Sequence, residues 1–412
     1  MVVPYKATLP AGPYPAGVTD GTAWLATLHA SAAERERAGL RRELRPRTDG
    51  DDLVDLAGND YLGLAAHPEV LAAATASLKA YGLGATGSRL VRGSTDVHAE
   101  LEASLASLLG TEAALVYSSG YLANLGAVRA LASTVVASDA HDHASLVDGC
   151  RIAAAGRRGS RTVVYRHASP SALAQALADD EMTTVDGRAV AVTESVFSVH
   201  GDLAPLPALH AVTRAAGGVL LVDDAHGFGV LGPRGAGGVA AAGLAGAPDV
   251  VVTATLSKSL GAAGGVVAGP AAFIRHLVDT SRTFIYDTGL PPAVAAGALA
   301  ALQLSVGPYG DLARACLRER ATEATSRLRA AGFTVPAPDG GVLSVIATGP
   351  EAAVSWAAAC RARGVAVGCF RPPSTPDGSS ALRLTINAGI ALEAFDHALA
   401  TIIATGELAG GG

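Results

Sequence analysis

The fold of this 412-residue chain follows from two apolar runs, GGVLLVDDAHGFG (217–229) and DVVVTATLSKSLGAAGG (249–265). Each run begins with aliphatic residues that favour a buried strand and then turns polar, the first at Asp223 and His226 and the second at Lys258. Buried strands that alternate with helices imply parallel pairing, and the carboxyl ends of parallel strands meet at one edge of the sheet. We therefore expect these three side chains to share one crevice.

A strand-end lysine faced by a carboxylate from another strand suits pyridoxal 5'-phosphate. This cofactor needs an amine to hold its aldehyde, a carboxylate to keep its pyridine nitrogen protonated, and hydroxyls and amides for its phosphate. Lys258 and Asp223 supply the first two groups, and Thr255 supplies a hydroxyl. Taken alone, a loop lysine or a helix-capping aspartate is the simpler interpretation of either residue. Because each follows a clear apolar strand, the pair favours the cofactor site.

The composition indicates a large globular protein. Half of the residues are hydrophobic and 17% are charged, so a large core is available, and the length is typical of about two or three domains. The net charge of −6 argues against nucleic acid or an anionic membrane as a partner. The four cysteines (150, 316, 360 and 369) form no CxxC pair, and no signal-peptide pattern opens the chain, so we expect a soluble, cytoplasmic protein.

The order of patterns predicts an α/β fold with a mostly parallel sheet covered by helices, followed by a small α+β C-terminal domain. Strands are predicted at 114–117, 134–139, 161–167, 188–196, 219–227, 250–258 and 264–270, and then at 341–348, 364–370 and 381–387. Helices are predicted at 22–44, 68–81 and 94–110, between the strands of the first group, after the prolines at 291–292, and at 350–363.

Three parts are predicted along the chain. Residues 1–58 form an N-terminal arm and helix, of which 1–19 are a loose arm. Residues 59–304 form a large cofactor-binding domain, and 305–412 form the small C-terminal domain.

The glycines of GLGATG (82–87) match the GxGxxG pattern of dinucleotide-binding sites. That site requires a strand before the glycines and a helix directly after them. Here a helix is predicted before them, and no helical periodicity follows until Ser94. We therefore expect no nicotinamide site. The sequence also contains no Walker A motif, GxSxG elbow or metal-ligand cluster.

Several longer motifs resemble the α-oxoamine synthases, which are pyridoxal-phosphate enzymes of fold type I, with an aspartate-aminotransferase-like large domain. They are NDYLGL (59–64), GATGSRLVRGSTDVHAELEASLASLLG (84–110), SSGYLANLGAV (118–128), SDAHDHASLVDG (138–149), ESVFSVHGDLAPL (194–206), LLVDDAHGFGVLG (220–232), TATLSKSLGAAGG (253–265) and FIYDTGLPP (284–292). They lie in collinear order over about residues 22–400.

The resemblance implies a homodimer with active sites at the subunit interface, and an acyltransferase that condenses an amino acid with an acyl thioester and releases CO₂. Within the family the chain looks most like the branch that joins L-alanine to pimeloyl-CoA, or to a pimeloyl-carrier protein, in biotin biosynthesis. A sister activity that uses glycine or another acyl-CoA stays open. The resemblance implies no metal.

The resemblance also implies roles at the reacting end of the cofactor. Lys258 would hold the aldehyde and later act as the base at the substrate α-carbon. Asp223 would pair with the pyridine nitrogen, because a protonated ring is the electron sink of the reaction. His226 would meet the phenolic oxygen, with Ser198 nearby, and His143 would stack on the ring.

The phosphate would lie at the start of the helix in SSGYLAN. The backbone amides of Gly120 and Tyr121 would bind it, because a helix N-terminus attracts anions. Ser119 and Thr255 would add hydroxyls from the same chain. Thr288 would add another from the partner subunit.

Two residues are expected to bind the substrates. Arg383 would hold the amino-acid carboxylate by a bidentate pair. Asn59 would contact the region of the acyl carbonyl, and an arginine at 41 or 42 would touch the acyl chain. The loop FIYDTGLPP departs from the family's commoner pattern at Asp287 and Gly289.

Overall fold

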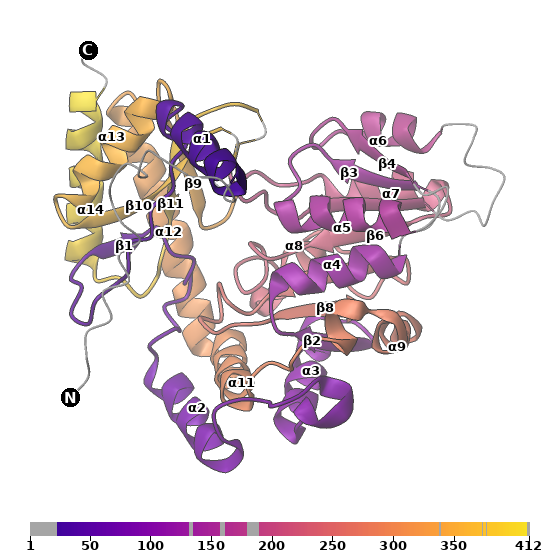
Figure 1. Ribbon diagram of the computed structural model, residues 1–412. Helices are drawn as coiled ribbons and strands as arrows, with labels where there is room; N and C mark the ends of the chain where they lie inside the picture. Colours follow the sequence, from indigo (N-terminus) through magenta and orange to yellow (C-terminus); the bar gives the residue numbers. More distant parts are fainter. Residues whose placement is uncertain are drawn as a thin grey trace. The chain divides into compact units, whose positions relative to one another are not determined.

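The computed structural model describes residues 23–131, 135–156, 161–178, 189–337, 339–372, 374–375 and 377–409 (Figure 1). The chain divides into two compact units, Met1–Asp52 and Leu53–Gly412. The described part of the first unit contains helix α1 (Ala23–Arg37), which ends earlier than the predicted helix at 22–44. The loose arm predicted for residues 1–19 lies outside the described residues.

The second unit contains a seven-stranded sheet in the order β2-β8-β7-β6-β5-β3-β4. β8 is antiparallel to both of its neighbours, and the other pairs are parallel, which confirms the predicted mostly parallel sheet. The strands are β2 (Ala113–Tyr117), β3 (Val135–Asp139), β4 (Arg161–Tyr165), β5 (Ala189–Glu194), β6 (Val219–Asp223), β7 (Val250–Thr255) and β8 (Gly265–Gly269).

Helices cover both faces of this sheet because its central strands are apolar on both sides. Along β6, Leu220 and Val222 pack into one hydrophobic cluster and Leu221 packs into another. One face is covered by α4 (Gly120–Leu131), α5 (Ala144–Gly156), α9 (Ala271–Thr280) and α10 (Arg282–Ile285). The other is covered by α3 (Asp96–Leu109), α6 (Pro170–Leu177), α7 (Leu206–Ala215), α8 (Gly238–Ala241) and α11 (Pro292–Val306).

Helix α2 (Pro68–Tyr81) packs against α11 and ends as predicted. The glycines at 82–87 follow this helix and precede the short π-helix η1 (Arg89–Gly93), so they lack the strand-before, helix-after context of a dinucleotide site. A short 3₁₀ helix, η3 (Pro233–Gly235), lies between β6 and α8.

A second sheet of four strands has the order β1-β10-β11-β9. Its strands are β1 (Val54–Leu56), β9 (Val342–Ile346), β10 (Val365–Phe370) and β11 (Ala381–Thr385). β1 pairs in parallel with β10, and the other pairs are antiparallel. β1 was not predicted, because a three-residue strand is too short to show an alternating pattern. The division into domains at 58 and 304 stays a prediction.

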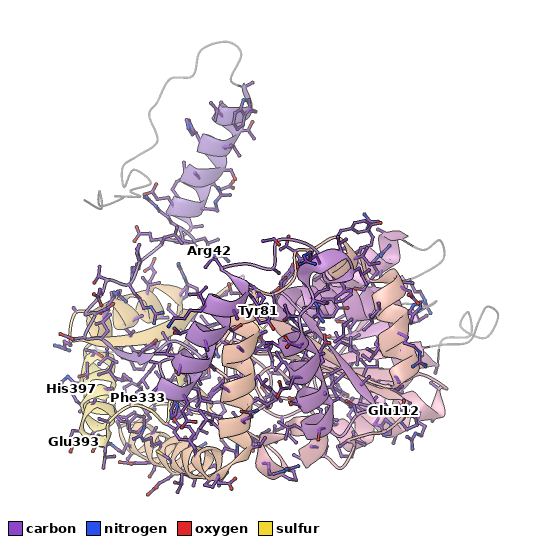
Figure 2. All side chains as sticks on the ribbon, turned by 90° about the horizontal axis from the view of Figure 1, so that it is seen from below. Arg42, Tyr81, Glu112, Phe333, Glu393 and His397 are labelled. Atoms are coloured by element: carbon purple, nitrogen blue, oxygen red, sulfur yellow. The ribbon has the colours of Figure 1, made fainter. Side chains whose placement is uncertain are left out.

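The helices beside this sheet are α12 (Pro308–Ala330), α13 (Pro350–Arg361) and α14 (Leu392–Ala409). Figure 2 shows Glu393 and His397 on the outer side of α14, while Phe395 and Leu399 are fully buried. Among the described residues, no single helix is long and apolar enough to cross a membrane. α11 and α12 meet that length and composition only as a pair, and the pair is bent by 73°.

Candidate active site

A cavity of about 240 Å³ lies at the carboxyl ends of the central strands, as the sequence predicted. It is lined by Ser119, Gly120, Tyr121, Asn124, His143, Ser145, Glu194, Asp223, Ala225, His226, Ala254, Thr255, Ser257 and Lys258. Eight of these were expected from the sequence: Ser119, Gly120, Tyr121, His143, Asp223, His226, Thr255 and Lys258. Ser198, Thr288, Asn59 and Arg383 do not line it.

Asp223 is the last residue of β6, and its carboxylate is held at both oxygens. Asn124 Nδ2 donates to one oxygen over 2.7 Å, and the backbone N–H of Ala225 donates to the other over 3.0 Å. Asp224 does not line the cavity and is fully buried, where it accepts a bond from Ser195 Oγ over 2.5 Å. Adjacent residues of a strand face opposite ways, and here only Asp223 faces the cavity.

Lys258 lies in the turn after β7 and contacts His226. The distance between Lys258 Nζ and His226 Nε2 is 2.7 Å, and the other ring nitrogen, Nδ1, lies 2.6 Å from the hydroxyl of Tyr61. Burial lowers the pKa of Lys258 to about 8, although the nearby Asp223 works in the opposite direction. A neutral amine is the form that attacks an aldehyde or accepts a proton, so a fraction of Lys258 is ready to react at neutral pH.

The N-terminus of α4 forms one end of the cavity. Ser119 Oγ accepts from the backbone N–H of Leu122 over 3.2 Å, and the amides of Gly120 and Tyr121 lie in the first turn, where helical N–H groups have no acceptor within the helix. A Cβ atom on Gly120 would lie 3.0 Å from Cβ of Thr255, a tight contact that a glycine at this position avoids. The result is a cluster of amides and hydroxyls suited to a phosphate.

His143 directly precedes α5 and lines the cavity. Its Nδ1 lies 2.7 Å from Ser145 Oγ, which in turn accepts a bond from Asn124 over 2.8 Å. Burial lowers the pKa of His143, so the neutral ring is favoured near neutral pH. The side chain of Tyr121 points elsewhere, since its hydroxyl bonds Asp148 over 2.5 Å. Only the backbone of Tyr121 is therefore placed to act at the cavity.

Glu194 and Asn124 are lining residues that the sequence reasoning did not assign to the site. Glu194, the last residue of β5, pairs in register with Asp223, and one of its buried carboxyl oxygens has no hydrogen-bond partner among the described residues. Burial raises its pKa well above the ordinary value, and the nearby Asp223 raises it further. Asn124 stands one helical turn after Gly120 in SSGYLAN, and that spacing could have indicated it.

Arg383 and Asn59 lie together outside the cavity lining. Arg383, on β11, donates from Nη2 to Asn59 Oδ1 over 2.6 Å, and its guanidinium lies 5.2 Å from the centre of the Phe370 ring. The Nε atom is buried and has no hydrogen-bond partner among the described residues. The charge of Arg383 lowers the pKa values of Lys258 and His226, so the guanidinium acts electrostatically on the cavity.

Ser198 and Thr288 do not line the cavity in this single chain, although the backbone of Ser198 bonds Glu194, which does. Thr288 is exposed, and the residue before it, Asp287, accepts a short hydrogen bond from Ser118 Oγ. The next residue, Gly289, is packed so closely that a Cβ atom there would lie 3.1 Å from Cδ of Arg89. The two departures from the family pattern in this loop therefore hold the loop in place. The roles of Ser198 and Thr288 stay predictions.

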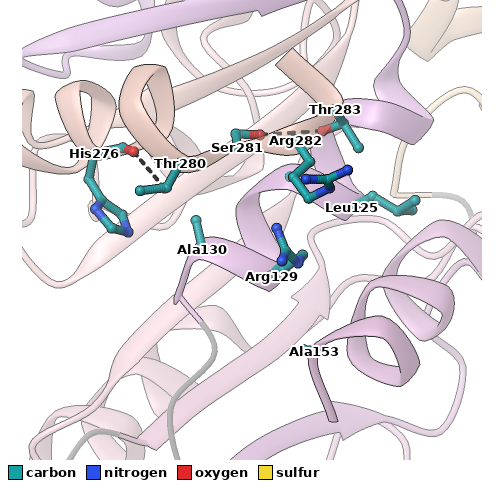
Figure 3. Close-up of a pocket in the computed structure, with 10 residues that line it drawn as sticks. Leu125, Arg129, Ala130, Ala153, His276, Thr280, Ser281, Arg282 and Thr283 are labelled. Carbon is teal, nitrogen blue, oxygen red and sulfur yellow. Dashed lines mark hydrogen bonds between the residues drawn. The ribbon is translucent and has the colours of Figure 1, made fainter. Parts of the chain in front are cut away.

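A larger cavity of about 360 Å³ opens between α4, α9 and α10 (Figure 3). Figure 3 shows the side chains of Arg129 and Arg282 on one side of it and His276 on the other. Its lining contains neither a lysine nor a carboxylate, and none of the predicted site residues. It therefore lacks the groups that a Schiff-base cofactor needs.

The smaller cavity combines the three groups that fit pyridoxal phosphate. Lys258 provides an amine of lowered pKa, Asp223 provides a carboxylate fixed at both oxygens, and Gly120 begins the helix whose first amides face an anion. The described residues contain no group of histidine, cysteine and acidic side chains suited to a metal ion.

Comparison with known proteins agrees with this site. Residues 51–402 match the family "Aminotransferase class I and II". The 8-amino-7-oxononanoate synthase of Mycolicibacterium smegmatis is 53% identical over 371 residues, which cover 89% of this chain and 92% of that one. The enzyme of the same name from Mycolicibacterium gilvum is 50% identical over 372 residues, covering 90% and 94% of the two chains.

Solved structures show the same fold. Serine palmitoyltransferase from S. paucimobilis, in a form with bound PLP, superposes with a TM-score of 0.85 at 30% identity, covering 95% of this chain and 100% of that one. 8-Amino-7-oxononanoate synthase from Francisella tularensis gives a TM-score of 0.71 at 26% identity, covering 86% and 98%. The fold and half-identical sequences extend over nearly the whole length, so the chain belongs to the class I and II aminotransferase family and, within it, to the 8-amino-7-oxononanoate synthases.

Proposed function

We propose that this chain condenses L-alanine with a pimeloyl thioester, of coenzyme A or a carrier protein, to give 8-amino-7-oxononanoate, CO₂ and the free thiol in biotin biosynthesis. The observation that carries the proposal is the cavity in which Lys258, His226 and Asp223 meet, in a chain about half identical to synthases of that name. In the reaction the amino-acid α-carbon gains an acyl group and loses its carboxylate.

Pyridoxal phosphate supplies an aldehyde that links to amines and a protonated ring that accepts an electron pair. Lys258 Nζ would hold that aldehyde, and its free amine would be the base for the α-proton of alanine. Asp223 faces the ring nitrogen, and Asn124 keeps the carboxylate in that orientation. His143 covers the ring, and His226 faces the phenolic oxygen.

The phosphate is bound by the amides of Gly120 and Tyr121 with the hydroxyls of Ser119 and Thr255. These groups meet at the start of α4, where Gly120 lies in close contact with Thr255. The helix dipole favours a negative charge at this end. Ser198 adds a contact near His226 when the cofactor is bound.

Arg383 binds the carboxylate of alanine, and Asn59 fixes the guanidinium while it contacts the region of the acyl carbonyl. The unpartnered Nε of Arg383 supports this role, because Nη2 is already held by Asn59 and a carboxylate can take the free edge.

Arg383→Lys is expected to raise the KM for alanine by about 10- to 150-fold and to change the KM for the acyl donor far less, because lysine cannot form the bidentate pair. Steady-state thiol release at varied concentrations of each substrate measures both constants. The conservative variant Arg371→Lys is a control in another arginine of the second unit. An increase confined to the acyl donor would place Arg383 in the other half of the site.

A homodimer in the cytoplasm is part of the proposal. Leu83, Leu90 and Val91 are exposed, and the backbone N–H of Gly289 bonds the carbonyl of Gly87 over 2.9 Å, which ties the loop of Thr288 to the segment that carries this apolar group. An exposed apolar group of this size favours contact with a second copy, which would bring Thr288 to the partner's phosphate site. The four free cysteines agree with a reducing compartment.

The substrates are tested by thiol release with alanine, glycine and serine, each against pimeloyl-, succinyl- and palmitoyl-CoA. We expect the highest kcat/KM with alanine and the pimeloyl donor. A pocket distinguishes one methyl group by about 1–3 kcal/mol, so glycine should be poorer by roughly 10- to 200-fold. CO₂ should be released in step with the thiol.

A preference for glycine or serine with another acyl chain would move the chain to a sister activity of the same fold. Loss of thiol release with every pair, in a protein that still shows a visible absorbance band removed by borohydride, would refute the condensation while keeping the cofactor.

A further inference from the structure

Tyr61 is a fully buried tyrosine that no sequence argument singled out. It lies in the turn after β1, and its backbone is fixed there because its carbonyl accepts from the N–H of Ala388 over 2.9 Å. Its ring packs against Gly341, where a Cβ atom would lie 2.5 Å from the ring. Gly341 directly precedes β9 and Ala388 follows β11, so residues beside the second sheet hold the phenol while its hydroxyl reaches His226, just beyond the end of β6.

The hydroxyl of Tyr61 and the amine of Lys258 occupy the two ring nitrogens of His226. Tyr61 Oη lies 2.6 Å from Nδ1, and Lys258 Nζ lies 2.7 Å from Nε2. Burial lowers the pKa of His226 well below its ordinary value, and the charge of Lys258 lowers it further, so the ring is neutral and carries a single proton. Which nitrogen holds that proton decides whether His226 donates or accepts a hydrogen bond on the Lys258 side.

The phenol determines this choice. Burial raises the pKa of Tyr61 to about 12, so the hydroxyl keeps its proton and can donate it in a hydrogen bond. The positive charge of Arg383 opposes this rise, and Nδ1 of His226 is the hydrogen-bond partner of the phenol among the described residues. The phenolic proton is then directed to Nδ1 of His226, and the ring proton is left on Nε2.

We propose that Tyr61 is a positioning residue that fixes His226 in its Nε2–H tautomer, so that His226 donates a hydrogen bond toward Lys258 Nζ and, in the loaded enzyme, toward the phenolic oxygen of the cofactor. The hydrogen bond to the cofactor's phenolic oxygen rests on the proposed function, whereas the hydrogen bond to Lys258 Nζ does not. In the cofactor-free chain the donated bond stabilises the neutral amine of Lys258, and this effect is measurable without substrate or cofactor.

The other charged groups around Lys258 are unchanged by a substitution at Tyr61. Asp223 and Glu194, on the ends of β6 and β5, favour the charged amine, and Arg383, on β11, disfavours it. His143 is coupled to the same cluster through Asp223 and Lys258. A difference between wild type and a Tyr61 variant therefore reports on the bond through His226.

The small number of lysines allows the pKa of Lys258 to be measured directly. The whole sequence contains only three lysines, Lys6, Lys79 and Lys258. Full-length protein labelled with ¹³C at lysine Cε and freed of cofactor should give three signals in a heteronuclear spectrum, and each can be followed against pH. Lys258→Arg and Lys79→Arg assign the signals, and the exposed Lys79 provides an internal reference.

Tyr61→Phe keeps the ring and removes the hydroxyl. We expect the pKa of Lys258 to rise by about 0.5 to 1 pH unit, because Tyr61 no longer favours the Nε2–H tautomer that stabilises the neutral amine. A shift of this size matches the net free energy of about one hydrogen bond. Tyr309→Phe is the matched control, because its hydroxyl bonds the carbonyl of Leu62 over 2.8 Å, in the same turn, without touching His226. This variant should leave the pKa of Lys258 as in wild type.

Equal pKa values of Lys258 in wild type and Tyr61→Phe would overturn the proposal, and so would an equal rise in Tyr309→Phe. A second measurement keeps the test open if Tyr61→Phe does not fold. In ¹⁵N-histidine-labelled wild type, the signals lost in His226→Gln must show a protonated Nε2 and an unprotonated Nδ1. The opposite pattern would refute the tautomer assignment. Failure of the condensation assay would contradict the proposed function but would not change the pKa of Lys258 or the protonation pattern of His226.

Discussion

Lys258→Ala is expected to lower kcat by at least about 10²–10⁴-fold, the loss typical of a missing general base, and to remove the covalent hold on the cofactor as well. Among the described residues that line the cavity, Lys258 alone carries an amine, and burial has already lowered its pKa to about 8. Thiol release from the pimeloyl donor gives the rate, and the visible absorbance of the purified protein reports the cofactor link.

Lys79→Ala is the matched control, because Lys79 is exposed on α2, far along the chain from the site. It should retain the wild-type rate and absorbance. A Lys258→Ala protein that kept the visible band and turned over at a comparable rate would show that another amine carries the chemistry.

Asp223→Asn is expected to slow removal of the α-proton by about 10²–10³-fold, the scale on which a fixed charge stabilises a developing one. An amide cannot keep the ring nitrogen protonated, although it fills the same space and can still accept from Asn124. The rate at which α-deuterated L-alanine loses its label to water isolates this step from the acyl donor.

Asp224→Asn is the neighbouring control. Asp224 is fully buried and bonded to Ser195, and burial raises its pKa to about 7, so the wild-type carboxyl is already partly protonated at neutral pH. This variant should exchange the label at nearly the wild-type rate and differ mainly in thermal stability. If both variants lost exchange to the same extent, the assignment of Asp223 to the ring nitrogen would fail.

The large sheet and the centre of the site could be predicted from the sequence because both depend on local patterns. Apolar runs gave the buried strands, and the rule that parallel strands end at one edge brought Asp223, His226 and Lys258 together. The start of α4 was predicted for the same reason, since Gly120 directly follows β2 and a polar turn.

The features that the sequence did not show are contacts between distant segments. Tyr61 and His226 are 165 positions apart, and Arg383 and Asn59 are 324 apart, so no periodicity in either segment reports the pairing. Glu194 was not among the predicted site residues, because its unpartnered oxygen is visible only in three dimensions. Thr288 could be suggested only by family resemblance, because a contact made by a second copy leaves no pattern in one chain.

The pairing of β1 with β10 has a consequence for how the protein is made. Val54 and Val365 are partners in this ladder although about 310 residues separate them. A ribosome adding roughly 5–20 residues per second needs on the order of 15 to 60 seconds to deliver the partner strand. During that time Leu56 and Tyr61, both fully buried in the finished protein, have no second sheet to cover them. The nascent chain therefore completes its large sheet first, and a chaperone that shields these two side chains would act in that interval.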